Sequence, residues 1–158
     1  MTTIAYKDGV MAADSLVTVN GMRAGAFTKV FDYQSMTSGA QVLIGFCGEP
    51  RHIAQAMAEV VNRKLDPLLS GSWPVGEYTA LIAIKHEPKS ECPPDIYLFE
   101  GAGHPYPIQA PYQAIGSGSE VATGAMAMGA TALQAVKTAI DLDTGSGGPA
   151  VSISFSSR

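Results

Sequence analysis

Residues 41–48, with the sequence QVLIGFCG, form a nearly continuous apolar run that ends in glycine. A strand with one face in water alternates polar and apolar residues, and this segment does not alternate. The run therefore predicts a β-strand that is buried on both faces. A sheet containing such a strand needs a covering layer on each side, which favours sheets packed centrally with helices outside.

The neighbouring segments supply further elements. An Asp-Gly pair at positions 8–9 is a strong two-residue turn signal between two extended segments, and it predicts a β-hairpin. Apolar residues recur at helical spacing from Pro50 to Leu65, which predicts a helix covering one side of a sheet. The segment 70–78 is expected to be an exposed loop with Trp73 as a contact anchor. The predicted strands are 2–7, 10–15, 41–48, 78–86, 95–101, 112–116 and 149–155, and the predicted helices are 50–65, 119–129 and 131–142.

The order of these elements indicates an α+β fold. Two Ala- and Met-rich helical segments follow most of the strands, and Gly129 before Thr131 predicts a helix break with a fresh N-cap. A chain of 158 residues is long enough to bury one sizeable core, and it contains no repeat or low-complexity tract. We therefore expect a single domain over residues 1–158.

Composition excludes several classes of function. The net charge of −4 and the scattered basic residues argue against a nucleic-acid partner, because phosphate binding needs a basic stripe. No segment reaches about 18 uninterrupted apolar residues, so no membrane span is expected. The opening MTTIAYKDG lacks the apolar region of a signal peptide, which predicts a cytoplasmic protein. Cys47 and Cys92 are not expected to form a disulfide, and the spacing of the histidines predicts neither a metal nor a cofactor.

Residues 143–146, Asp-Thr-Gly-Ser, match the catalytic loop of an aspartic protease. That chemistry needs two aspartates that share one proton, each on a turn that follows an apolar strand. The residues before Asp143 instead have helical periodicity, and the glycines after it are typical of a helix end. The sequence therefore disfavours an aspartic protease and leaves a glycine-rich helix end as the simpler interpretation.

Several short motifs occur in a defined order: TTI from residue 2, AAD from 12, TKV from 28, GFCG from 45, GSGS from 116 and DTGSGG from 143. In this order they resemble the proteasome β-subunits and the bacterial HslV-like peptidases, within the N-terminal-nucleophile hydrolases. The resemblance extends from Thr2 to about Ile153. It implies a four-layer αββα sandwich, with two antiparallel sheets between helix layers. It also implies a threonine-type peptidase acting on peptides or unfolded proteins, a self-compartmentalised homo-oligomeric ring, and an ATP-driven unfoldase as a candidate partner.

The resemblance also implies one catalytic site built from distant parts of the sequence. Its nucleophile falls on Thr2, exposed by removal of Met1, which is expected before a residue as small as threonine. The threonine that follows it in the family falls on Thr3. The family's acid falls on Asp14 and its lysine on Lys29. The glycine whose amide forms the oxyanion hole falls on Gly48. The polar residues near the terminal amine fall on Ser117, Asp143 and Ser146.

Elementary chemistry supports this assignment. A threonine hydroxyl is a weak nucleophile, but a terminal α-amine has a pKa of about 7.7 to 8.0 and is suited to act as its base. Lys29, held by Asp14, would keep a positive charge nearby and favour the neutral amine. Asp143 and Ser146 would orient the amine by hydrogen bonds, and the amide of Gly48 would stabilise a tetrahedral oxyanion.

The same residues also have simpler structural interpretations. Asp14 and Lys29 could form an ordinary surface ion pair. Gly48 could simply end a strand, and Ser117 could cap the helix that follows it. Cys47 is expected to be a small buried hydrophobic residue.

Two other functions stay open at this point. A non-catalytic subunit of the same fold, used in structure or assembly, would differ from the peptidase in retaining Met1. An N-terminal-nucleophile amidase for small molecules is disfavoured, because such chains are usually longer and more often use Cys or Ser as the nucleophile.

Overall fold

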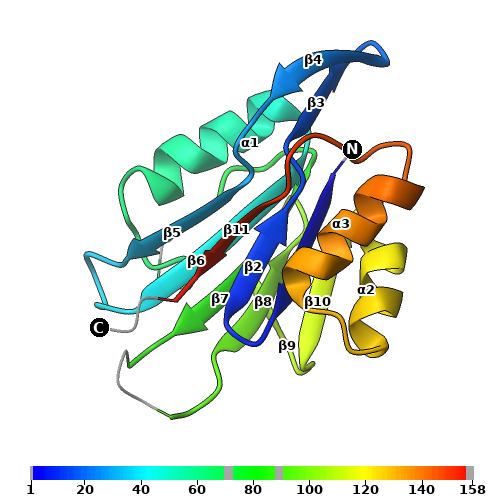
Figure 1. Ribbon diagram of the computed structural model, residues 1–158. Coiled ribbons are helices and arrows are strands. Elements are labelled where there is room, and N and C mark those ends of the chain that lie inside the picture. Colours follow the sequence, from blue (N-terminus) through cyan, green and yellow to red (C-terminus); the bar gives the residue numbers. More distant parts are fainter. Residues whose placement is uncertain (1, 70–72, 88–90, 156–158) are drawn as a thin grey trace.

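The computed structural model describes residues 2–69, 73–87 and 91–155. These residues form a mixed α+β fold with two larger antiparallel sheets and helices outside them (Figure 1). The first, which we call the β1 sheet, has the strand order β10-β1-β2-β11, so β1 pairs with a segment more than a hundred residues later in the chain. Its strands are β1 (Thr3–Lys7), β2 (Val10–Ala13), β10 (Tyr112–Gly116) and β11 (Val151–Ser154).

The hairpin of β1 and β2 forms around the predicted turn. Asp8 and Gly9 have φ angles of 51° and 79°, and positive φ at both positions is the turn geometry that matches the twist of paired strands. Strand β1 is buried along its first four residues and β2 along its last three. The hairpin prediction is confirmed, and the hairpin lies inside the protein with both faces covered.

The second sheet, which we call the β6 sheet, has the order β5-β6-β7-β8-β9. Strand β6 coincides with the predicted apolar run, and seven of its eight residues are buried, so that prediction is confirmed. The strands are β5 (Val30–Gln34), β6 (Gln41–Gly48), β7 (Tyr78–Lys85), β8 (Asp95–Phe99) and β9 (Tyr106–Ile108).

The helix after Pro50 begins as predicted but ends earlier. Helix α1 (Pro50–Ala56) continues as a π-helical turn, η1 (Met57–Val61). Lys64 then adopts a φ of 51°, a left-handed conformation that ends a helix, so the apolar spacing up to residue 65 does not correspond to a longer helix. No helix in the part of the chain that the structure describes is long and apolar enough to cross a membrane.

The two later helices confirm the predicted break. Helix α2 (Ser119–Ala127) ends just before Gly129, and α3 (Ala132–Leu142) begins after Thr131. The Thr131 hydroxyl accepts the Gln134 amide proton and the Gln134 side chain accepts the Thr131 amide proton, which forms a capping box.

Three hydrophobic clusters hold the helices and sheets together, and they explain why the β6 run does not alternate. One face of β6 packs with α1 and η1, and the other packs against the β1 sheet. The third cluster joins the β1 sheet to α2 and α3 through small residues, which allow a close approach. Representative members are Ile44, Phe46, Ile53 and Val60 in the first cluster, Ile4, Met11, Leu43 and Leu81 in the second, and Ala5, Ala12, Met126 and Val136 in the third.

Some elements were not predicted. Strands β5 and β9 were missed, as was the ribbon of β3 (Leu16–Val19) and β4 (Met22–Ala26), which projects from the sheets in Figure 1. Every residue of β4 is exposed, so no alternation marks it as a strand.

The prediction that Trp73 is an exposed contact anchor is wrong. Its side chain is 4 % exposed, its indole N–H donates to the Pro67 carbonyl oxygen at 2.9 Å, and its ring stacks on Phe99 at 4.7 Å between centroids. The local Gly, Ser and Pro content is typical of a loop, but the partner ring comes from the distant strand β8. Residues 70–72 of the predicted loop lie outside the described residues.

Candidate active site

Thr2 lies at the entrance to β1 and is almost fully buried, with 4 % of its surface exposed. Its position depends on a close approach of two backbones: a Cβ at Gly116 would collide with the Thr2 carbonyl oxygen. Gly116 also has a φ of 96°, which favours glycine. The end of β10 therefore fixes the start of β1. Met1 lies outside the described residues, so its expected removal stays a prediction.

Asp14 and Lys29 form a buried ion pair next to this strand entrance. The Lys29 Nζ donates to Asp14 Oδ1 at 2.9 Å, and the two residues are 5 % and 1 % exposed. The carboxylate also accepts the amide proton of Thr3 on Oδ1 and that of Gly147 on Oδ2, both at 3.0 Å. The interpretation as a surface pair is therefore wrong. Asp14 ties three segments together and holds a cation that burial would otherwise disfavour.

A second polar group surrounds Asp143, which follows the last residue of α3. The hydroxyls of Ser146 and Ser117 donate to the same carboxylate oxygen, Oδ2, at 2.6 and 2.7 Å. Burial alone would raise the pKa of Asp143, but these two hydrogen bonds and one from the Gly145 backbone outweigh it and hold that pKa below its ordinary value. Asp143 is therefore an ionised acceptor. Asp143 is also the residue at which helix α3 ends, which agrees with the interpretation of residues 143–146 as a helix end.

The interpretation of Ser117 as a helix cap is wrong. The residue at the cap of α2 is Gly118, which has no side-chain cap, and the Ser117 hydroxyl points to Asp143 instead. The Ser117 Oγ also lies 3.5 Å from the Thr2 carbonyl oxygen, which links this group to the start of β1.

Gly48 is the last residue of β6, and the packing around it requires glycine. Its φ is 129°, and a Cβ there would lie 2.5 Å from the Glu77 carbonyl oxygen and 2.6 Å from the Tyr78 Cα. The strand-end interpretation is therefore confirmed. It is compatible with an oxyanion role for the Gly48 amide, which stays a prediction.

A cavity of about 120 Å³ is lined by three of the predicted site residues, Thr2, Lys29 and Gly48. A cavity of about 150 Å³ lined by aliphatic and aromatic side chains accepts a benzene ring, so this one has room for a small apolar group beside Thr2. A larger depression of about 770 Å³, around Tyr6 and Cys92, contains none of the predicted site residues. The smaller cavity is lined by Thr2, Lys29 and Gly48 together with Leu16, Val17, Thr18, Phe27, Phe46, Pro50 and Ile53.

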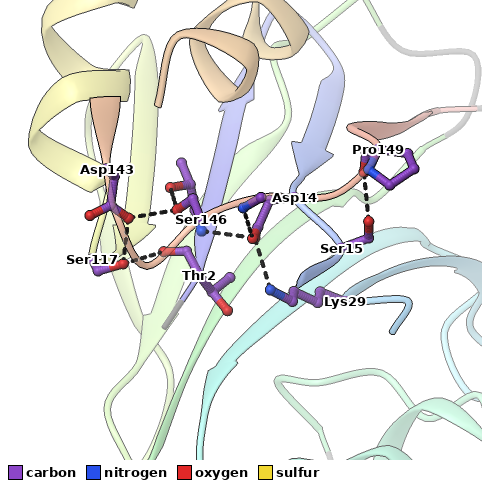
Figure 2. Close-up of polar contacts among 10 residues, drawn as sticks. Thr2, Asp14, Ser15, Lys29, Ser117, Asp143, Ser146 and Pro149 are labelled. Carbon is purple, nitrogen blue, oxygen red and sulfur yellow. Dashed lines mark hydrogen bonds and ion pairs between the residues drawn. The ribbon is translucent and has the colours of Figure 1, made fainter. Parts of the chain in front are cut away.

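The structure therefore brings all seven predicted site residues into one region, although six different segments supply them. Figure 2 shows Thr2 between Ser117 on one side and Lys29 on the other. Sequence reasoning missed the role of the Gly147 amide: this glycine lies in the DTGSGG motif, but no contact with Asp14 was assigned to it. It also missed the contact of the Thr3 hydroxyl with Ser146, since Thr3 was placed only as the residue after the nucleophile.

Cys47 and His52, which lie next to or near Gly48 in the sequence, have structural roles. Cys47 is buried as predicted, and burial raises the pKa of its thiol. His52 Nδ1 accepts the Glu77 amide proton at 2.9 Å. Among residues 2–69, 73–87 and 91–155, no group of three or more His, Cys, Asp or Glu side chains is placed to hold a metal ion.

No protein-family model and no curated protein matches the sequence. Many solved structures share its fold, and two of them illustrate the likeness. BPH from Thiobacillus denitrificans, in complex with epoxomicin, is 20 % identical, with 98 % of each chain covered and a TM-score of 0.62. Anbu, an ancestral β-subunit from Yersinia bercovieri, is 12 % identical, with 97 % of this chain and 80 % of the other covered and a TM-score of 0.73. The likeness establishes a proteasome-like fold for this chain.

Proposed function

We propose that this protein is a threonine-type peptidase whose nucleophile is the hydroxyl of Thr2, exposed at the chain terminus by removal of Met1. The observation that carries the proposal is that Thr2, Lys29 and Gly48 line one cavity. Lysine is rarely buried unless its charge has a use or a partner. Here Lys29 has Asp14 as its partner, beside the residue that would react.

In the proposed mechanism, the α-amine of Thr2 takes the proton from its own hydroxyl as the oxygen attacks a peptide carbonyl carbon. The positive charge of Lys29 stabilises the negative charge that develops on this oxygen, and the Gly48 amide donates to the carbonyl oxyanion. The protonated amine then gives its proton to the leaving amine, which leaves an ester on Thr2. Water attacks the ester by the same proton transfers and releases the second product.

Ser117, Asp143 and Ser146 orient the α-amine in this mechanism. The ionised Asp143 carboxylate attracts an ammonium group, and the two serine oxygens offer acceptors that direct its N–H bonds. The nitrogen lone pair then faces the hydroxyl.

The proposed substrates are peptides or unfolded proteins with a small apolar side chain at the attacked carbonyl. The largely apolar lining of the cavity supports this preference, because burying a charge there would be costly. Every step of the proposed mechanism is assigned to residues of this chain and a water molecule.

We further propose a single domain over residues 1–158 with a four-layer αββα arrangement. The succession of three hydrophobic clusters supports it. The proposed assembly is a ring of identical subunits in the cytoplasm, with an ATP-driven unfoldase as a candidate partner. Exposed apolar residues at the ends of α2 and α3 support subunit contacts: Met128, directly after α2, is 90 % exposed and Leu142, the last residue of α3, is 69 % exposed. The alternative is a non-catalytic structural or assembly subunit of the same fold.

Intact-mass measurement before and after treatment with epoxomicin tests the proposal. We expect a mass without Met1 and one adduct on each chain, absent from a variant in which a non-removable residue precedes Thr2. A protein that retains Met1 and still cleaves peptides overturns the threonine mechanism. A protein that retains Met1 and cleaves nothing favours the structural subunit.

A further inference from the structure

The hydroxyl of Thr3 is a fully buried group that the mechanism above does not use. Thr3 is 0 % exposed, and its Oγ1 lies 2.6 Å from the Ser146 Oγ. The hydroxyl fills a niche left by a glycine, because a Cβ at Gly118 would collide with Thr3 Oγ1. Its position is therefore set by the packing around it.

The direction of this hydrogen bond follows from counting protons. Asp143 is an ionised acceptor, so the single hydroxyl proton of Ser146 goes to Asp143 Oδ2 at 2.6 Å. Ser146 can then only accept from Thr3, and Thr3 must donate. The same count assigns the proton of Ser117 to Asp143 at 2.7 Å. The result is a directed chain from Thr3 through Ser146 to Asp143.

Such a chain is cooperative, because a hydroxyl that accepts a hydrogen bond becomes a stronger donor. The Thr3 donation therefore strengthens the bond from Ser146 to the Asp143 carboxylate. It also occupies one of the two lone pairs of Ser146 Oγ, which leaves a single acceptor direction for another donor.

We propose that Thr3 is a positioning residue: by donating to Ser146, its hydroxyl locks Ser146 as a donor to Asp143 and so fixes the orientation and basicity of the Thr2 α-amine. This inference rests on the proposed function. The other charged groups at the site are Asp14 and Lys29. Asp14 contacts Thr3 through the Thr3 backbone amide, and Lys29 contacts Asp14, so a change of the Thr3 side chain leaves both contacts in place.

Thr3→Val tests the inference, since valine has nearly the same shape and lacks the hydroxyl. With the Ser146 bond weakened, the Asp143 charge is less dispersed, and it holds the ammonium form of the Thr2 amine more firmly. We expect kcat to fall by about tenfold with little change in KM, which is the scale of one lost hydrogen bond. The acid limb of the pH–rate profile should move to higher pH. Thr3→Ser should restore both properties.

A further measurement separates failure of this inference from failure of the proposed function. In an NMR titration, the Asp143 carboxyl should protonate at higher pH in Thr3→Val than in the wild type, and this readout needs no turnover. An unchanged Asp143 titration overturns the inference whether or not the protein is a peptidase. A wild type that cleaves no peptide, combined with a shifted Asp143 titration, supports the hydrogen-bond order and assigns the failure to the proposed function.

Gly118→Ala provides an independent variant if Thr3→Val does not fold. The added methyl group meets Thr3 Oγ1 and displaces the hydroxyl without removing it. We expect the same fall in kcat and the same shift of the Asp143 titration. Wild-type values for both in a folded Gly118→Ala protein overturn the inference.

Discussion

Two aspartates are buried in hydrogen-bond networks in the part of the chain that the structure describes, and one of these two belongs to the candidate site. Asp14 and Asp66 are 1 % and 3 % exposed. Asp66 accepts the hydroxyl proton of Ser38 at 2.5 Å and the amide proton of Leu68 at 2.9 Å. These contacts join the turn between β5 and β6 to the segment after η1.

The two networks differ in charge and in access. The Asp14 network includes the cation of Lys29, and that lysine borders a cavity. Among the described residues, no cation lies within ion-pair distance of Asp66. A buried carboxylate bonded to hydroxyls and amides is therefore a means of holding loops together, and it does not by itself indicate catalysis. The feature that distinguishes the candidate site from the Asp66 network is the buried cation of Lys29 together with the cavity beside it.

Removal of the proposed nucleophile should produce the largest difference in activity between variants of the two networks. Thr2→Ala should lower peptide cleavage by at least about a thousandfold, because no other hydroxyl takes the place of a lost nucleophile. Ser38→Ala is the matched control from the Asp66 network and should cleave at the wild-type rate. Equal losses in both variants would mean that the two networks do not differ in function.

Removal of the cation tests what distinguishes the Asp14 network. Lys29→Ala should lower kcat by about a hundredfold or more, because it removes an electrostatic contact to the developing charge. It should also lower the free energy of unfolding by about 3 kcal/mol, since Asp14 stays buried without its counter-charge. Urea denaturation and steady-state kinetics measure the two effects. A stable, fully active variant would contradict both assignments.

The cavity is the second distinguishing feature. Val17 lines it from the β3 strand, so Val17→Phe should narrow it. We expect cleavage after branched aliphatic residues to fall by about tenfold in kcat/KM, the scale at which apolar pockets discriminate size. Val19→Phe on the same strand, at a position 56 % exposed and outside the cavity, is the control. If both variants lose activity equally, the ribbon matters for folding and not for substrate fit.

Asp66→Asn tests the structural network. The substitution should lower the free energy of unfolding by about 1 to 3 kcal/mol, because it disturbs a buried hydrogen-bond acceptor. It should leave kcat/KM for peptide cleavage unchanged. Thermal unfolding and a peptide-cleavage assay decide the outcome. A loss of activity at wild-type stability would place Asp66 in the functional network.

The smallest expected effect concerns acid stability. Because the folded pKa of Asp143 is lowered, its carboxylate contributes stability above its ordinary pKa, and this contribution is lost as pH falls through the folded pKa. Stability should therefore decline below about pH 4. Asp143→Asn should reduce the slope of that decline slightly, since the side chain is only half-buried. Unfolding curves at pH 7 and pH 3 measure the difference, and identical slopes would contradict the lowered pKa.

Local patterns predicted the elements that carry their own signals. The apolar run of β6, the turn at Asp8 and the helix N-cap at Thr131 each depend on neighbouring residues, and all three are confirmed. The burial of Trp73 was missed because its partner ring comes from a distant segment. Strand β4 was missed because all of its residues are exposed, so no buried face marks it as a strand. Periodicity alone cannot reveal such contacts.

The candidate site shows the same division. The resemblance named the residues, but the burial of the Asp14–Lys29 pair and the direction of the Thr3–Ser146 bond depend on contacts across 15 and 143 positions of sequence. Ser117 was open to interpretation as a helix cap because the residue that accepts its proton, Asp143, lies 26 positions away. The catalytic roles themselves stay predictions.

The strand order of the β1 sheet has a consequence for how the protein is made. Strand β1 leaves the ribosome first, but it pairs with β10, and its neighbour β2 pairs with β11 near the other end of the chain. The groups around Thr2 can therefore assemble only when synthesis is nearly complete. Until β10 and β11 are available, β1 and β2 can pair only with each other. The candidate site around Thr2 therefore depends on segments that are synthesised long after Thr2 itself.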